Sequence, residues 1–158
     1  MKNNKITKAR KYENTKIIMV YDRFHQFRYE EHKNWTGKYP FEELSRKIIG
    51  AAIKVHRELG PGFLENIYEE ALKIEFSEQN LIFNSQKEIK IKYLGIEIGI
   101  HRLDLLVEKK IIVELKAVKE FADIHFAQLR SYLRATGLKV GLLLNFAKAT
   151  LEIKRIVN

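Results

Sequence analysis

Two charged residues interrupt an apolar run at residues 111–118, whose sequence is IIVELKAV. This β-rich composition predicts a strand, in which alternate side chains point to the same face of a sheet. Glu114 and Lys116 therefore share one face, and the apolar residues beside them share the other. Asp104 interrupts the preceding β-rich run, residues 101–107, in the same way. A carboxylate on a buried strand is costly unless another group compensates its charge.

The charges of Asp104, Glu114 and Lys116 can be balanced in two ways. A salt bridge to Lys116 compensates one carboxylate but not two, and carboxylates that face each other across a hairpin repel. A divalent cation with oxygen ligands removes that repulsion. The residue pattern alone leaves the metal site and the salt bridge open. An acid and base pair of carboxylates, as in sugar cleavage, is a further alternative, but it gives Lys116 no role.

The connection between these two strands decides whether the carboxylates meet. Asp104 opposes Glu114 on one face only if the polar residues 108–110 form a three-residue connection. A two-residue turn would place the carboxylates on opposite faces unless a bulge intervenes. We therefore predict the three-residue connection or a bulged equivalent.

Other candidate residues lie on predicted helices. Glu65 falls in the first turn of a helix that follows Gly60-Pro61-Gly62, where a carboxylate also suits the helix dipole. Tyr68 lies three residues further and is expected to share its face. Gln128 and Tyr132 are spaced i, i+4 on the side of a third helix expected to face the sheet, together with Ile124 and Ala135, which is also typical of an amphipathic boundary.

Two histidines adjoin these motifs. His101 and His125 could lie near the site, but a lone histidine is more often a surface or hydrogen-bonded core residue. Neither histidine is assigned as a ligand.

The predicted elements alternate in a way that can position these residues. Helices are predicted at about residues 40–59, 63–79 and 124–135, and strands at residues 88–93, 101–107, 111–118, 138–145 and 151–157. Asp123 is expected to cap the third helix. The apolar faces of the second helix are expected to include Leu64, Ile67, Tyr68, Ala71, Leu72, Ile74 and Phe76. Two helices, three strands, one helix and then one or two strands, since residues 151–157 could form one more, predict an α/β sandwich on a mixed sheet.

The amino-acid composition excludes several kinds of functional site. The chain of 158 residues has no cysteine, which excludes disulfides and thiolate metal sites and agrees with a reducing, cytoplasmic location. Any metal must then be held by carboxylates, histidines and water. No apolar run is long enough to cross a bilayer, and no secretory signal is recognisable.

The net charge of +9 lies mostly before residue 41, where ten Lys or Arg face four Asp or Glu. We predict a domain at residues 40–158 preceded by a basic, aromatic-containing extension at residues 1–39. A flexible or loosely docked extension is favoured over a basic arm that contacts phosphates and stacks bases. The apolar residues 17–20 could form a strand, but no partner is evident nearby.

Several ordered motifs resemble those of the GxxExxY proteins of bacteria and archaea. The resemblance covers about residues 41–157 and is absent before Pro40. The matching segments are GFLENIY at residues 62–68, RLDLLV at 102–107, IVELKAV at 112–118, HFAQLRSYL at 125–133 and GLKVGLLLNF at 137–146.

The resemblance implies the PD-(D/E)XK nuclease superfamily and its RecB-like branch, with a restriction-endonuclease-like αβββαβ core whose mixed central sheet is flanked by helices. It implies a Mg²⁺-dependent phosphodiesterase, with Mn²⁺ expected to substitute. The implied metal ligands are Asp104, Glu114, the Leu115 carbonyl and, through water, Glu65. Lys116 would position the attacking water.

The same resemblance implies that Gln128 and Tyr132 form a Q-x-x-x-Y element that supports the site or contacts substrate, a role also considered for Tyr68. Leu103 stands where proline precedes the aspartate in the superfamily pattern, a departure that the superfamily tolerates. The expected partner is nucleic acid, with DNA favoured over RNA and no membrane. A homodimer is left open, and the alternative is a nucleic-acid-binding or regulatory module without turnover.

Overall fold

The computed structural model describes residues 40–158 and the backbone of residues 19–21 and 27–29. The elements are β1 (Met19–Tyr21), β2 (Phe27–Tyr29), α1 (Glu42–Leu59), α2 (Glu65–Glu78), β3 (Phe83–Tyr93), β4 (Ile96–Val107), β5 (Ile111–Lys116), α3 (Asp123–Thr136), β6 (Val140–Asn145) and β7 (Glu152–Val157). From α1 on, the elements follow the predicted order.

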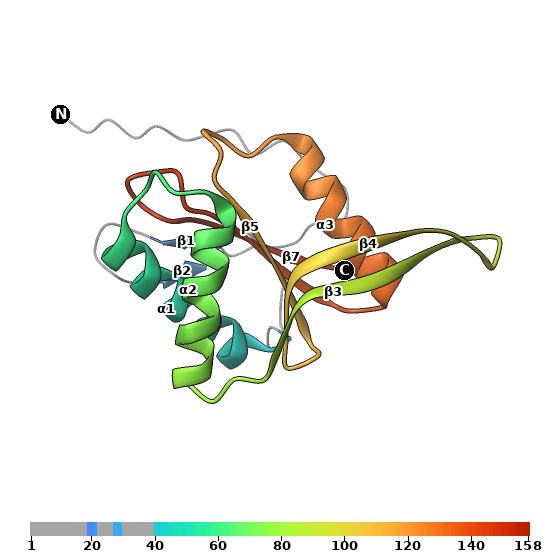
Figure 1. The fold of residues 1–158 in the computed structure, drawn as a ribbon, viewed down its shortest axis with the longest axis horizontal. Coiled ribbons are helices and arrows are strands. Elements are labelled where there is room, and N and C mark those ends of the chain that lie inside the picture. The colour runs from blue at the N-terminus through green and yellow to red at the C-terminus, as the bar shows by residue number, and fades with distance from the viewer. Residues whose placement is uncertain (1–18, 22–26, 30–39) are drawn as a thin grey trace.

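A five-stranded mixed sheet, in the order β3-β4-β5-β6-β7, lies at the centre of residues 40–158 (Figure 1). The β5–β6 pair is parallel, and the other three pairs are antiparallel. A parallel pair needs a crossover connection, and α3 supplies it. The α/β fold with a mixed sheet flanked by helices is therefore confirmed.

Helices cover both faces of the sheet (Figure 1). One core cluster joins the buried residues of α1 and α2 to β5 residues such as Val113 and Leu115. The other joins α3 to Ile112 of β5. Because neighbouring side chains on a strand point to opposite faces, the nearly continuous apolar sequence of β5 supplies both cores.

The segment between α1 and α2 is fixed by Tyr68. Its hydroxyl donates to the Gly60 carbonyl at 2.8 Å and accepts from the Phe63 N–H at 3.1 Å. The Tyr68 ring stacks on Phe146 with 4.4 Å between centroids. These contacts position the start of α2, where Glu65 lies.

The predicted edges of α2 and α3 need correction. The second helix begins at Glu65 rather than at residue 63, and Leu64, Ile67 and Ile74 are exposed, so its buried apolar residues are Tyr68, Leu72 and Phe76. The side of α2 that carries Tyr68 and Leu72 packs against the core. Leu64, Ile67 and Ile74 lie away from that side and therefore do not contact the sheet.

Asp123 is the first residue of α3 and not its cap. The preceding residue, Ala122, donates its N–H to Nδ1 of His125 at 3.1 Å, so a histidine ring supplies the acceptor at this helix start. Ile124 and Ala135 are exposed, and α3 instead packs through Leu129, Tyr132 and Leu133.

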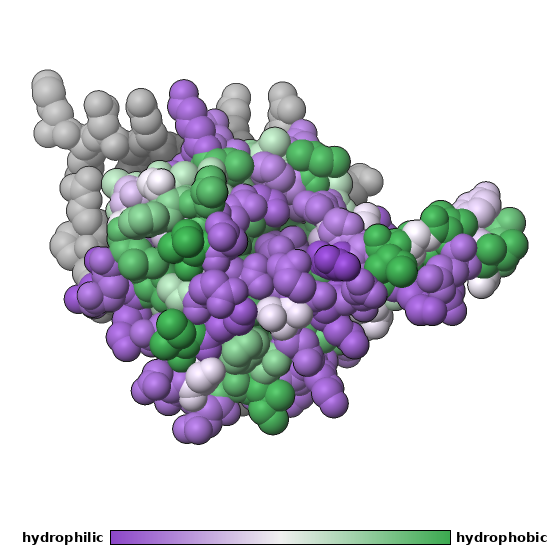
Figure 2. Space-filling view, in the orientation of Figure 1, coloured by the Kyte–Doolittle hydropathy of each residue, from purple (hydrophilic) through white to green (hydrophobic). Residues whose placement is uncertain are grey.

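β3 and β4 are both longer than the strands predicted at residues 88–93 and 101–107. They form a hairpin that extends beyond the helices (Figure 1). Its pairing shifts between Ile91, which is opposite Gly99, and Lys92, which is opposite Glu97, so Ile98 has no partner in the register. Apolar side chains lie exposed along this projecting hairpin, among them Ile96, Ile98 and Ile100 (Figure 2).

The strand expected at residues 17–20 is described only in part. Residues 19–21 form β1, which pairs antiparallel with β2, a partner that the sequence did not reveal. The rest of the predicted extension lies outside the described residues. Within the part of the chain that is described, no helix combines the length and apolarity needed to cross a membrane.

Candidate active site

The β4–β5 connection has the predicted three residues, 108–110. The strands pair regularly at Val107 with Ile111, at Leu106 with Ile112 and at Leu105 with Val113. The next positions in this register would be Asp104 and Glu114, where the regular pairing ends.

Side chains replace backbone pairing at this point. Asp104 Oδ2 accepts the Leu115 N–H at 2.9 Å, and Glu114 Oε1 accepts the Asp104 N–H at 3.4 Å. The carboxylate of Asp104 on β4 thus accepts a hydrogen bond from the backbone of β5, and that of Glu114 on β5 accepts one from the backbone of β4. The structure places Asp104 and Glu114 beside each other at the end of the β4–β5 ladder.

Strand β4 rotates at Asp104. Residues two apart normally share a face, yet Leu105 packs in the α1 and α2 core while Leu103 packs in the α3 core. On β3, Gln86 lies level with Asp104, has a φ of 51° and is omitted from the regular pairs on either side. Asp104 therefore lies where the backbone pairing is irregular toward both β3 and β5. Its side chain need not follow the face alternation of a regular strand.

Lys116 lies beside Glu114, as the alternation of the strand predicts. Its Nζ is 3.8 Å from Glu114 Oε2, and the two side chains are 14% and 4% exposed. One ammonium group at this distance compensates one carboxylate. The second negative charge is left to other groups.

Burial, followed by the charge of Asp104, raises the pKa of Glu114 to about 8, although Lys116 opposes the shift. Burial also raises the pKa of Asp104, against the Leu115 N–H and the charge of Lys116. Without a cation, the site therefore disfavours two ionised carboxylates.

Glu65 reaches the end of β5 from α2. Its Oε1 accepts the Ala117 N–H at 3.0 Å, and its charge contributes to the raised pKa of Asp104. The first turn of α2 thus adds a third, solvent-exposed carboxylate to the surroundings of Asp104 and Glu114.

Tyr132 and His101 approach the cluster from α3 and β4. Their rings stack with 4.3 Å between centroids, and the Tyr132 hydroxyl is hydrogen-bonded to Nε2 of His101. Burial, followed by the charge of Glu114, raises the pKa of Tyr132, and Gln128 hydrogen-bonds to its hydroxyl. The charge of His101 lowers the pKa of Asp104. Tyr132 and His101 therefore lie close enough to the two carboxylates to interact electrostatically with them, and Gln128 contacts Tyr132.

The sequence matches the model of the PD-(D/E)XK nuclease superfamily over residues 42–156. The chain belongs to this superfamily. A comparison with curated proteins found no significant match. One solved structure, the crystal structure of SSO0001, is 17% identical, with a TM-score of 0.45, and the match covers 75% of this chain and 59% of that one. The chain thus spans less than two thirds of that structure, and this likeness carries no functional argument.

A further carboxylate of this superfamily member was not singled out in the sequence. Glu69 is buried on α2 and accepts a hydrogen bond from Gln86 Nε2 at 2.9 Å. Burial raises its pKa, and the charge of Asp104 contributes. The available signal was its i, i+4 spacing from Glu65, which puts both on one side of the helix.

Two candidates make hydrogen bonds to the backbone rather than to the site carboxylates. Tyr68 is fully buried in the core, so it supports the segment before Glu65 and has no surface for substrate. His125 accepts the Ala122 N–H at the start of α3. For Leu115, the N–H is engaged by Asp104, and its carbonyl as a metal ligand stays a prediction.

The donor set fits a hydrated divalent cation better than a closed protein cage. Within residues 40–158, no three His, Asp or Glu side chains form a ready metal-binding group. Two buried carboxylates with one nearby ammonium still leave negative charge uncompensated. Mg²⁺ commonly binds through one or two carboxylates and keeps several waters, so the residues present are compatible with it.

Proposed function

We propose that this chain is a divalent-metal-dependent nuclease that hydrolyses phosphodiester bonds in nucleic acid, with DNA favoured over RNA. The observation that carries the proposal is the meeting of Asp104, Glu114 and Lys116 at the open end of the β4–β5 ladder. Membership of the PD-(D/E)XK nuclease superfamily supports it. The ordered motifs further support assignment to the GxxExxY group and the RecB-like branch.

In this proposal Asp104, Glu114 and the Leu115 carbonyl hold Mg²⁺ or Mn²⁺, and Glu65 assists through water. The bound cation supplies Lewis-acid activation of water and neutralises charge on the phosphate. The hydrogen bond from the Leu115 N–H fixes the Asp104 carboxylate in place, so the chain orients this ligand before any cation arrives.

Lys116 is proposed to position the attacking water and to offset negative charge in the pentavalent transition state. Its side chain is mostly buried, which reduces solvent screening of its charge. Tyr132, held by His101 and Gln128, is proposed as a positioning residue on the α3 side of the same cluster.

The test is cleavage of labelled single-stranded and duplex DNA and RNA, with Mg²⁺, Mn²⁺ or EDTA. We expect the wild type to cleave at least one substrate only when metal is present. Lys116→Ala is expected to lower the rate by on the order of a hundredfold or more, because a group that stabilises transition-state charge is lost.

The matched control is Lys47→Ala, an exposed lysine on α1 that should leave the rate unchanged. Circular dichroism verifies that both variants fold. Equal rates for wild type and Lys116→Ala would contradict the proposed role of Lys116 and point to a contaminating nuclease.

A non-catalytic nucleic-acid-binding module is the second candidate. The observation in its favour is that Asp104 and Glu114 each already accept a backbone N–H, at 2.9 and 3.4 Å, so both carboxylates have partners within the protein. Binding of nucleic acid without metal-dependent cleavage across the same substrates would support this alternative.

A further inference from the structure

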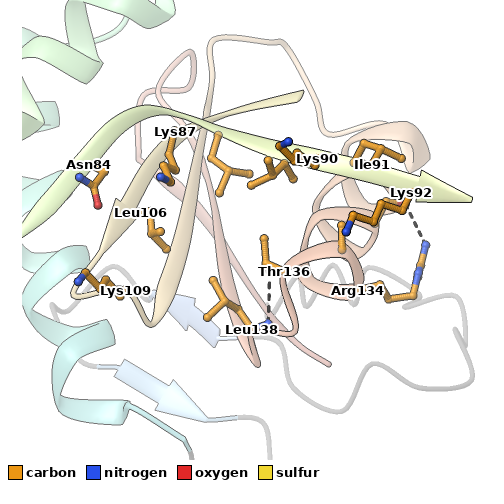
Figure 3. A pocket seen from close by; sticks show the side chains of 14 residues that line it. Asn84, Lys87, Lys90, Ile91, Lys92, Leu106, Lys109, Arg134, Thr136 and Leu138 are labelled. Carbon is orange, nitrogen blue, oxygen red and sulfur yellow. Dashed lines mark hydrogen bonds between the residues drawn. The ribbon is translucent and has the colours of Figure 1, made fainter. Parts of the chain in front are cut away.

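A groove with a volume of about 950 Å³ lies between β3, β4 and the C-terminal half of α3 (Figure 3). Its side chains include five cations from three separate segments of the chain. They are Lys87, Lys90 and Lys92 of β3, Lys109 of the β4–β5 connection and Arg134 of α3. Among the described residues, no Asp or Glu lines this cationic groove.

Most of these positive charges are not neutralised. Within residues 40–158, no carboxylate lies within ion-pair distance of Lys87, Lys92 or Lys109. Lys90, by contrast, forms an ion pair with Glu97 at 2.8 Å. Arg134 donates to the Ser131 hydroxyl at 2.9 Å, which is a neutral partner. A concave surface with several uncompensated cations attracts a polyanion.

The remaining lining of the cationic groove is largely apolar. Ile91, Leu106 and Leu138 lie between the cations, and all three are partly exposed. A duplex presents phosphates and sugars at its outer edge and would leave such a surface uncovered. Unpaired bases can cover it with their flat faces, while their phosphates meet the lysines.

The cationic groove adjoins the candidate active site. Its residue Ile89 pairs across β3 and β4 with His101, whose ring stacks on Tyr132 of the active-site cluster. On α3, Ser131 precedes Tyr132 and Arg134 follows it by two residues, and both line the groove. A strand bound in the groove would therefore pass close to Tyr132.

We propose that the cationic groove binds single-stranded nucleic acid, with Lys87, Lys92, Lys109 and Arg134 contacting phosphates and the apolar side chains contacting bases. The groove then selects an unpaired strand as the substrate that reaches Asp104 and Glu114. The selection of a substrate rests on the proposed nuclease function, but the binding itself can be measured without catalysis.

The test is fluorescence anisotropy of a labelled oligodeoxynucleotide, single-stranded or as a duplex of equal length, in EDTA. The groove variant is Lys87→Gln with Lys92→Gln. The matched control is Lys47→Gln with Lys54→Gln, which removes the same charge from exposed positions on α1, across the sheet from the groove. Thermal unfolding of both variants checks that the fold is kept.

We expect the wild type to bind the single strand more tightly than the duplex. The groove variant should weaken single-strand binding by about tenfold or more at about 0.1 M salt. It should reduce the slope of log K against log salt by about 1.4, because each phosphate contact on a single strand contributes about 0.7. The control should change binding by less than about twofold.

Three results would each overturn the groove proposal. They are an equal loss of single-strand affinity in the groove and control variants, tighter binding of the duplex than of the single strand, and no binding by the wild type. Cleavage with Mg²⁺ is measured in parallel. Groove-dependent binding without cleavage contradicts the nuclease proposal alone, whereas Lys116-dependent cleavage without groove dependence contradicts the groove proposal alone.

Discussion

Glu114 is only 3% exposed and lies beside the carboxylate of Asp104. A buried position of this kind is ordinarily occupied by an apolar side chain. Lys116, whose Nζ is 3.8 Å from Glu114 Oε2, compensates only part of this charge, because one ammonium group faces two carboxylates. Natural proteins commonly retain such unfavourable groups at active sites, where function requires them. The metal-free site should therefore lower the free energy of unfolding by a measurable amount.

The raised pKa of Glu114 makes the metal-free protein less stable as pH rises. The folded protein holds a proton on Glu114 above the ordinary glutamate pKa of 4.5, where the unfolded chain has lost it. The free energy of unfolding therefore falls with rising pH until the folded pKa is passed. Glu114→Gln should flatten this dependence and raise stability at about pH 8 by on the order of 1 kcal/mol, as measured by denaturant unfolding in EDTA.

The control for this prediction is Glu43→Gln, an exposed carboxylate on α1 for which no comparable effect is expected. If Glu114→Gln unfolds more readily than the wild type at the higher pH, the carboxylate stabilises the metal-free fold and the electrostatic argument is wrong.

At the level of elements, the β4–β5 hairpin could be predicted because the two-residue period of a strand fixes which connection brings Asp104 toward Glu114. The end of the ladder at these residues could not be predicted. It depends on the rotation of β4 between Leu103 and Leu105 and on the left-handed backbone of Gln86. Packing against three helices sets both features, and local composition does not encode them.

The packing of α3 on the sheet gives a second prediction of stability. A Cβ added at Gly141 of β6 would lie 2.7 to 2.9 Å from side-chain atoms of Leu129. Gly141→Val should therefore displace α3 and lower the free energy of unfolding by about 1–3 kcal/mol. Chemical denaturation measures this change. The control is Gly50→Ala on α1, since alanine has the highest helix propensity.

The added Cβ at Gly50 meets no atom within 4 Å, so Gly50→Ala should be neutral or slightly stabilising. A Gly141→Val variant as stable as the wild type would show that α3 can shift on the sheet without loss, contrary to the close packing seen here.

For the whole molecule, the order of helices and strands predicted the α/β fold because long periodic segments specify both element type and burial. The cationic groove could not be predicted, since Lys87, Lys109 and Arg134 come together only in three dimensions. Net charge gave no guide to it, because most of the excess lies before residue 41. Glu69 was missed for a related reason: its burial and its contact with Gln86 depend on how α2 packs on the sheet.

The most direct test of the account is calorimetric titration of Mn²⁺ into the metal-free protein. Wild type is expected to bind Mn²⁺ saturably, and Asp104→Asn and Glu114→Gln should each weaken binding by on the order of tenfold or more, because ligating carboxylates are removed. Glu43→Gln should bind as the wild type does. Unchanged affinity in both active-site variants would show that Asp104 and Glu114 do not share a cation, and would contradict the central claim.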